Sequence, residues 1–134
     1  MKKYENYCKH LHVLEKAAEQ DLGNEFIISG IIDKFFIQFE LGWKLLKELL
    51  KYEGRAFAAM GSPRAIIKEA YITYNFLQED IWLEMLENRN DMAHIYDGGK
   101  ARELADIIIS KFVPEFQTME NFIHDRYGDV LETL

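Results

Sequence analysis

Three side chains with complementary chemistry, Arg89, His94 and Tyr96, lie close together in the sequence. Histidine titrates near neutral pH and can both accept and release a proton. Arginine keeps its charge and presents a planar fork that binds phosphate oxygens in pairs. A neutral base beside a phosphate clamp suits the cleavage of RNA, in which the 2′-hydroxyl is a built-in nucleophile that DNA lacks.

The same residues also have a purely structural interpretation. His94 would cap the last carbonyl groups of a helix, and Arg89 would pair with a carboxylate about one turn away. The neighbouring carboxylates are those of Glu84, Glu87 and Asp91. An arginine followed five residues later by a histidine is a short pattern that also arises by chance. The spacing alone leaves both interpretations open.

Other kinds of site lack support in the sequence. His10 and His12 point about 200° apart on a helix and cannot bind one metal ion together. Cys8 is the only cysteine, which excludes an intrachain disulfide and favours a reducing compartment. No glycine-rich phosphate loop and no serine nucleophile motif is present. We therefore expect neither a metal nor a cofactor.

Length and charge limit the classes of protein further. The 134 residues predict a single domain over residues 1–134. The net charge is -7, and residues 61–134 carry fourteen acidic side chains against seven basic ones. Such a surface repels nucleic acid at long range, so any RNA contact must be local, or the acidic half faces a basic protein. With no signal peptide and no membrane span apparent, we expect a cytoplasmic protein.

The apolar spacing predicts an all-α fold, an up-and-down bundle of four to five helices. The first helix is expected over about residues 3–21, and the second carries apolar residues from 28 to 50 and stops at Gly54. Ser62 and Pro63 are typical of the start of a third helix. A fourth is expected over residues 79–96, and a last one over 100–127 with a kink at Pro114.

These elements position the candidate residues. On a helix that runs to residue 96, Arg89 and Tyr96 are seven apart and lie nearly in line. His94 is offset from Arg89 by about 140°, a gap that a long arginine side chain near a helix end can bridge. The second helix also carries aromatic residues outside one stripe, which indicates a surface for a second copy of the chain.

Longer motifs resemble a known family. They are Phe39–Lys47 followed by Tyr52–Gly54, then Ser62–Arg64 with Glu69 and Ala70, and then Trp82–Asn90 running into Ala93–Tyr96. Over about residues 5–125 these motifs resemble the nucleotidyltransferase substrate-binding-like proteins, a branch of the HEPN superfamily. The resemblance implies a bundle of about five helices, a homodimer, and a separate minimal nucleotidyltransferase as partner.

Two functions follow from this resemblance. In one, the bundle is a non-catalytic subunit that binds substrate for the nucleotidyltransferase. In the other, the pair is a toxin and antitoxin. The bundle is then a metal-independent endoribonuclease with an Arg-x4-His motif at a dimer interface, and the partner silences it by transferring AMP from ATP onto a tyrosine.

Carried onto this sequence, the resemblance assigns roles to five residues. Arg89 contacts the scissile phosphate, His94 is the general base or acid, and Asn90 is a supporting polar residue. Tyr96 accepts the AMP group, and Arg64 supplies a further phosphate contact. A third reading, a helical assembly module in which Arg89 and His94 are structural, also fits the spacing.

Overall fold

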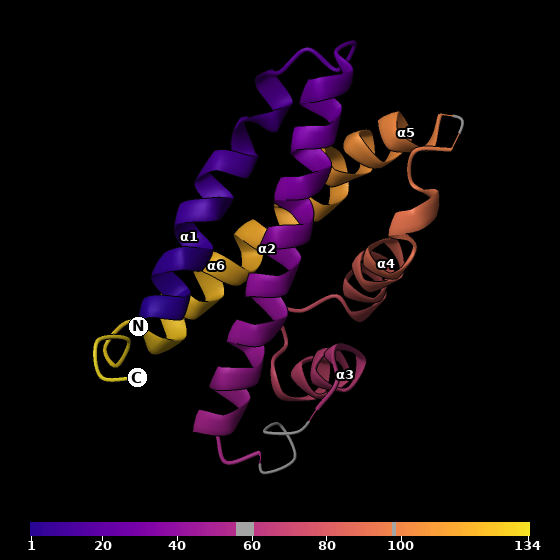
Figure 1. Ribbon diagram of the computed structural model, residues 1–134. Coiled ribbons are helices and arrows are strands. Elements are labelled where there is room, and N and C mark those ends of the chain that lie inside the picture. The colour runs from indigo at the N-terminus through magenta and orange to yellow at the C-terminus, as the bar shows by residue number, and fades with distance from the viewer. Residues whose placement is uncertain (56–60, 98) are drawn as a thin grey trace.

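The predicted all-α bundle is confirmed by the computed structural model, which describes residues 1–55, 61–97 and 99–134. Within these ranges the chain is helical, without any strand (Figure 1). The helices are α1 (Lys2–Leu14), α2 (Glu25–Tyr52), α3 (Pro63–Thr73), α4 (Glu79–Asn90), α5 (Lys100–Ile107) and α6 (Val113–Tyr127). Two 3-10 segments, η1 (Glu15–Glu19) and η3 (Met92–His94), and one π-helical turn, η4 (Ile108–Phe112), complete them.

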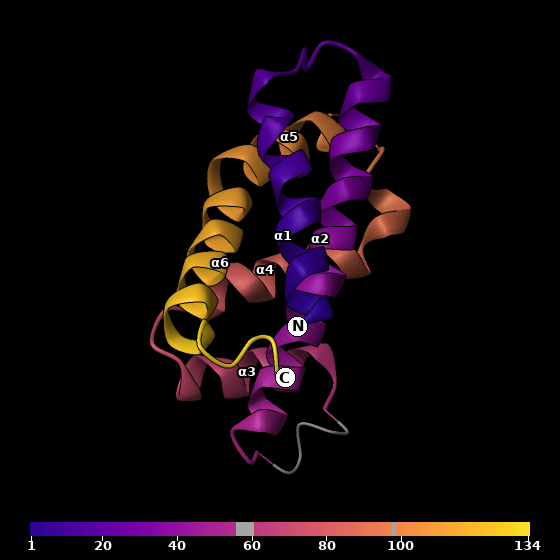
Figure 2. The same cartoon turned by 90° about the vertical axis from the view of Figure 1, so that its left-hand side faces the viewer.

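Helix α2 is the central element of the fold. It contacts α1, α3, α4 and α5, and α1 also packs on α6. Figures 1 and 2 show α1 and α2 side by side, whereas the shorter α3 and α4 run across α2. The two ends of the chain meet at one end of the bundle, where the amino group of Met1 donates a hydrogen bond to the carbonyl oxygen of Leu131.

Both ends of α2 follow from local sequence chemistry. Asn24 is the N-cap, and its Oδ1 accepts hydrogen bonds from the backbone N–H groups of Phe26 and Ile27 at 2.9 and 3.3 Å. Gly54 has a φ of 82°, a conformation that glycine adopts without steric cost. The N–H groups of Gly54 and Arg55 then bond back into the last turn, as in a Schellman motif. The predicted stop at Gly54 is confirmed.

The predicted start of α3 is also confirmed. Ser62 Oγ accepts a hydrogen bond from the Ala65 N–H at 3.3 Å, and Pro63 occupies the first helical position, where its missing N–H costs nothing. Residues 56–60, which precede this helix in the sequence, lie outside the described ranges, as does Gly98.

Two predicted helix boundaries and one predicted kink differ from the structure. The first α-helix ends at Leu14 and tightens into η1, short of residue 21. The fourth helix ends at Asn90 and not at Tyr96, because its end is rich in Asn and Asp, which compete with helical backbone bonding. The kink at Pro114 is not confirmed: Pro114 lies in the first turn of α6, directly after the π-helical turn η4.

Aromatic side chains fill the core between α1, α2, α4 and α6. The Phe35 ring stacks on Phe112, and the Trp82 ring meets the edge of Phe116. The buried Tyr7 hydroxyl donates a hydrogen bond to the Phe116 carbonyl oxygen at 2.7 Å. This packing holds α2 in a fixed relation to α4, the helix that carries Arg89 and Asn90. None of the described helices is both long enough and apolar enough to span a membrane.

Candidate functional site

Arg89 lies in the last turn of α4 and reaches across to α2. Its Nε donates a hydrogen bond to Glu40 Oε1 at 2.9 Å, and its Nη1 donates to Asn90 Oδ1 at 3.1 Å. About a third of each side chain of the Arg89–Glu40 pair is exposed. The guanidinium is therefore fixed from two sides while part of it still faces solvent.

The pair depends on a close approach of two helices. A Cβ atom at Gly42 would lie 3.0 Å from Cη2 of Trp82, so only glycine lets this ring rest on α2. Trp82 precedes Arg89 by about two turns of α4. The Gly42–Trp82 contact thus sets the separation of the helices that bring Arg89 to Glu40.

A small charged cluster surrounds Glu40. Its second carboxylate oxygen, Oε2, accepts a hydrogen bond from Trp43 Nε1 at 3.0 Å and lies 3.9 Å from Lys44 Nζ. Two cations, Arg89 and Lys44, share this one carboxylate. The cluster keeps a net positive charge on a chain that is acidic as a whole.

The structure shows that the structural interpretation of Arg89 named the wrong partner. We expected a carboxylate within one helical turn, but the partner is Glu40, from another helix. Glu40, Trp43 and Lys44 all lie in the quoted motif Phe39–Lys47, yet no spacing rule links them to α4. Only the tertiary contact shows that they belong to the site.

His94 lies outside α4, in the 3-10 turn η3. Its side chain is 63% exposed, and Nδ1 lies 3.4 Å from Oδ2 of Asp97, which is also exposed. The expectation that His94 caps the helix that carries Arg89 is wrong, because that helix ends at Asn90 with Asp91 as its C-cap residue. The imidazole is thus open to an incoming substrate, with a carboxylate at one of its nitrogens.

Tyr96 follows on the same turn and is 56% exposed. Since α4 ends before it, the expected alignment of Tyr96 with Arg89 on one helix does not occur. Tyr96 instead borders a cavity of about 380 Å³ between the start of α2 and α5. Ser29 and Arg102 also line this cavity, and Arg102 Nη1 donates a hydrogen bond to the Leu22 carbonyl oxygen at 3.0 Å.

Asn90 and Arg64 line a different cavity, which is open and has a volume of about 1020 Å³. It lies between the start of α3 and helix α4. Its other lining residues are Asp80, Leu83, Glu84, Glu87 and Asp91. Four carboxylates thus surround one arginine, so this cavity attracts cations more than phosphate. Asn90 connects the cavity to Arg89 through the hydrogen bond that its Oδ1 accepts.

Across residues 1–55, 61–97 and 99–134, no three His, Cys, Asp or Glu side chains are grouped so that they could hold a metal ion. Cys8 is half-buried on α1, and burial raises the pKa of its thiol to about 12, so it remains protonated at neutral pH.

The sequence matches the model of a known protein family. A family model described as "Nucleotidyltransferase substrate binding protein like" matches residues 2–125, nearly the whole chain. The matched region contains α1 to α5, most of α6 and every candidate residue described above. No curated protein matches the sequence.

Proposed function

Because this chain belongs to the nucleotidyltransferase substrate-binding-protein-like family, we propose that it is the helical subunit that works with a separate minimal nucleotidyltransferase. The match over residues 2–125 carries this proposal. Within it, we further propose that the subunit is a HEPN-type ribonuclease that cuts RNA without a metal ion and whose Tyr96 receives AMP from the partner.

The proposed cleavage uses the RNA's own 2′-hydroxyl. His94 removes the proton from this hydroxyl, the 2′-oxygen forms a bond to phosphorus, and the bond from phosphorus to the 5′-oxygen breaks. The leaving 5′-oxygen takes up a proton, so the products are a 2′,3′-cyclic phosphate and a 5′-hydroxyl end. Arg89 stabilises the negative charge that grows on the phosphate oxygens in the transition state.

The observation that carries this step is the arrangement of Arg89. Glu40 and Asn90 hold its guanidinium in place, and Lys44 leaves the cluster with a net positive charge. An arginine oriented in advance loses less conformational entropy when it binds phosphate. His94, five residues later, is 63% exposed, so a substrate can reach its imidazole, and its Nδ1 lies 3.4 Å from Asp97 Oδ2.

The surroundings of Tyr96 support its modification. The residue is exposed on a turn where a partner enzyme can reach it. Arg102 lines the same cavity and offers a cation to the phosphate of a transferred AMP group.

We also propose a homodimer, for which the exposed apolar residues Phe26 and Ile37 on α2 offer surface.

A second candidate function has support of its own. The cavity next to Asn90 carries four carboxylates, and Glu40 already neutralises much of the charge on Arg89. Both features disfavour RNA and favour a non-catalytic subunit that presents substrate to the nucleotidyltransferase. The two functions differ in whether the purified chain alone cuts RNA.

The deciding experiment incubates the purified chain with total RNA in the presence of EDTA. Wild type is compared with His94→Ala and with His124→Ala, because His124 is likewise exposed and lies 3.4 Å from an aspartate. We expect cleavage by wild type and His124→Ala and none by His94→Ala. Cleavage by His94→Ala would refute the proposed role of His94. If wild type fails to cut RNA although its intact mass shows that it carries no AMP, the result would favour the non-catalytic substrate-binding subunit.

A further inference from the structure

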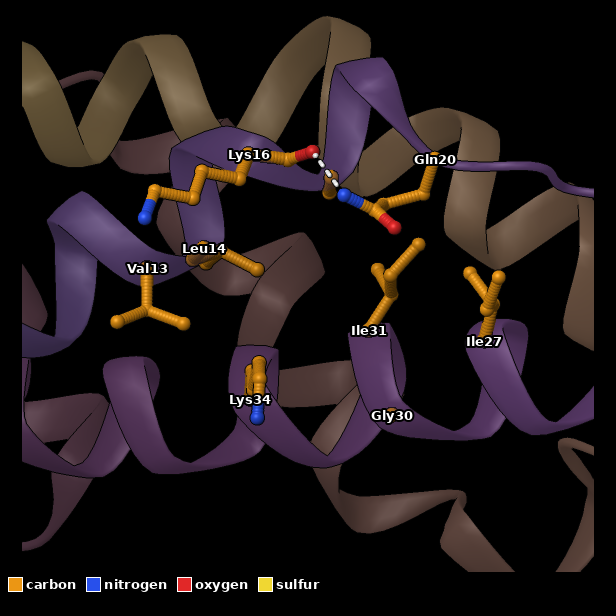
Figure 3. A pocket seen from close by; sticks show the side chains of 9 residues that line it. Val13, Leu14, Lys16, Gln20, Ile27, Gly30, Ile31 and Lys34 are labelled. Atoms are coloured by element: carbon orange, nitrogen blue, oxygen red, sulfur yellow. Dashed lines mark hydrogen bonds between the residues drawn. The ribbon is translucent and has the colours of Figure 1, made fainter.

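A separate apolar groove lies between the end of α1, η1 and the first turns of α2. Its volume is about 290 Å³, close to the lower end of the range of about 300–1,000 Å³ typical of ligand pockets. Figure 3 shows its two walls. The apolar lining residues are Val13, Leu14, Ala17, Ile27 and Ile31. The groove borders none of the candidate residues of the site described above.

Two lysines stand on opposite walls of this groove. Lys16 comes from η1 and Lys34 from α2, and both lie toward the Val13 end, whereas Ile27 lies at the other end (Figure 3). Neither lysine forms an ion pair with a residue in the described parts of the chain, although most other basic side chains there do. The groove is therefore cationic at one end and apolar at the other.

Gly30 keeps the groove open. It lies inside α2, where glycine is less stable than alanine because it loses more conformational freedom on folding. A Cβ atom at this position would meet nothing within 4 Å, so no neighbouring group requires a glycine there. This contrasts with Gly42 on the same helix, which Trp82 requires. The missing side chain instead adds space to the groove.

We propose that this groove binds a small anionic amphiphile, a carboxylate on a short unbranched hydrocarbon chain. The carboxylate lies between Lys16 and Lys34, and the chain runs over Ile31 toward Ile27. Each methylene removed from water adds to affinity, and the two ammonium groups recognise the charged head.

A nucleotide fits the groove poorly, even though it carries a phosphate. Apart from the lysines, Gln20 is the one polar side chain in the lining, and its amide nitrogen already donates to the Lys16 carbonyl oxygen at 3.2 Å. Gln20 alone cannot satisfy the several ring nitrogens of a nucleobase, and those left in apolar surroundings without hydrogen-bond partners cost free energy. The lining therefore favours a hydrocarbon body over a base.

The test measures the binding of octanoate, 1-octanol and AMP to the full chain by NMR titration. We expect octanoate to bind at least tenfold more tightly than octanol, and AMP to leave the groove resonances unchanged. In Lys16→Gln/Lys34→Gln, octanoate affinity should fall at least tenfold to that of octanol. Gly30→Leu, which places a side chain in the groove, should abolish binding of both. Each variant's unfolding transition verifies that it is folded.

The matched control is Lys9→Gln/Lys47→Gln, which removes one lysine from α1 and one from α2 outside the groove. Its octanoate affinity should equal that of wild type. Three results would overturn the proposal: octanoate binding that survives Gly30→Leu, equal loss in the control, or AMP shifting the groove resonances in preference to octanoate. The proposal would also be overturned if wild type bound no octanoate and Gly30→Leu changed the sedimentation coefficient. The groove would then be occupied by a second copy of the chain.

Discussion

Arg89 and Glu40 are 49 positions apart in the sequence, and a hydrogen bond of 2.9 Å joins the Arg89 Nε to the Glu40 Oε1. The pair has two opposite consequences for a phosphate ligand. Glu40 fixes the direction of the guanidinium, and it also offsets part of the positive charge that would attract RNA. The balance between these effects can be measured because a glutamine keeps the shape of Glu40 and removes its charge.

Glu40→Gln is expected to strengthen binding of an RNA oligonucleotide about fivefold, which corresponds to about 1 kcal/mol for one charge near 4 Å in water. The amide oxygen can still accept a hydrogen bond from Arg89 or Trp43. Binding is measured by fluorescence anisotropy at several salt concentrations. Glu48→Gln is the control, because Glu48 also lies on α2 and pairs with Lys3 and Lys51 instead. Weaker binding in Glu40→Gln would contradict the expected gain and would show that the positioning of Arg89 by Glu40 outweighs the charge of Glu40.

Replacement by alanine is expected to change the free energy of unfolding in opposite directions at the two glycines of α2. Gly42→Ala brings a methyl group to 3.0 Å from Trp82 and should lower the free energy of unfolding by about 1–3 kcal/mol. Gly30→Ala meets no atom within 4 Å and should raise it by about 0.5–1 kcal/mol. Urea unfolding of both variants measures the difference. A neutral Gly42→Ala would show that α4 can move away from α2 without cost.

Local chemistry explains which parts of this fold could be predicted from the sequence. The start of α3 at Ser62 and Pro63 and the end of α2 at Gly54 depend on residues at those positions, so the sequence identifies both. The end of α4 was missed because Met92 and Ile95 continue an apolar pattern past Asn90. In the structure Ile95 is buried and Met92 is exposed, so that pattern reflects a 3-10 turn and not another turn of α-helix.

The candidate site could be predicted only in part for a related reason. Arg89, His94 and Tyr96 were selected by type and spacing, and that spacing assumed one continuous helix. The contacts of Arg89 with Glu40, and of Tyr96 with the cavity that Arg102 lines, arise from the packing of separate helices. Residues that are far apart in the sequence and meet only in the folded chain leave no recognisable spacing pattern in a single sequence.

Tyr96→Phe tests the proposed acceptor of AMP. Without the hydroxyl oxygen no phosphodiester bond to this side chain can form, so incubation with the cognate nucleotidyltransferase and ATP should add no AMP mass. Wild type should gain it, and the gain should suppress RNA cleavage because the adduct adds negative charge and bulk two residues after His94. Intact-mass spectrometry reads the modification, and Tyr71→Phe, at a tyrosine with nearly equal exposure, is the control. Mass gain in Tyr96→Phe would place the acceptor elsewhere.

Glu115 predicts a dependence of stability on pH. It is a buried carboxyl on α6, and its Oε1 accepts a hydrogen bond from the Gln78 N–H, at the start of α4, at 3.1 Å. Burial raises the pKa of Glu115 above its ordinary value of 4.5, and the nearby Asp80 adds to the rise, although the Gln78 hydrogen bond opposes it. The folded chain therefore binds this proton more tightly than the unfolded chain does.

The sign of the effect follows from that difference. Between the ordinary value of 4.5 and the raised native pKa, the folded state holds more protons, so Glu115 lowers stability as pH rises through this interval. Glu115→Gln keeps an oxygen that can accept from Gln78 and cannot ionise. The free energy of unfolding of Glu115→Gln, minus that of wild type, should thus increase as the pH is raised from below 4.5 to neutrality. Urea titrations at each pH measure this difference. Glu79→Gln is the control, because it removes a half-buried carboxyl from the first turn of α4. A constant difference between wild type and Glu115→Gln would show that Glu115 ionises equally in both states.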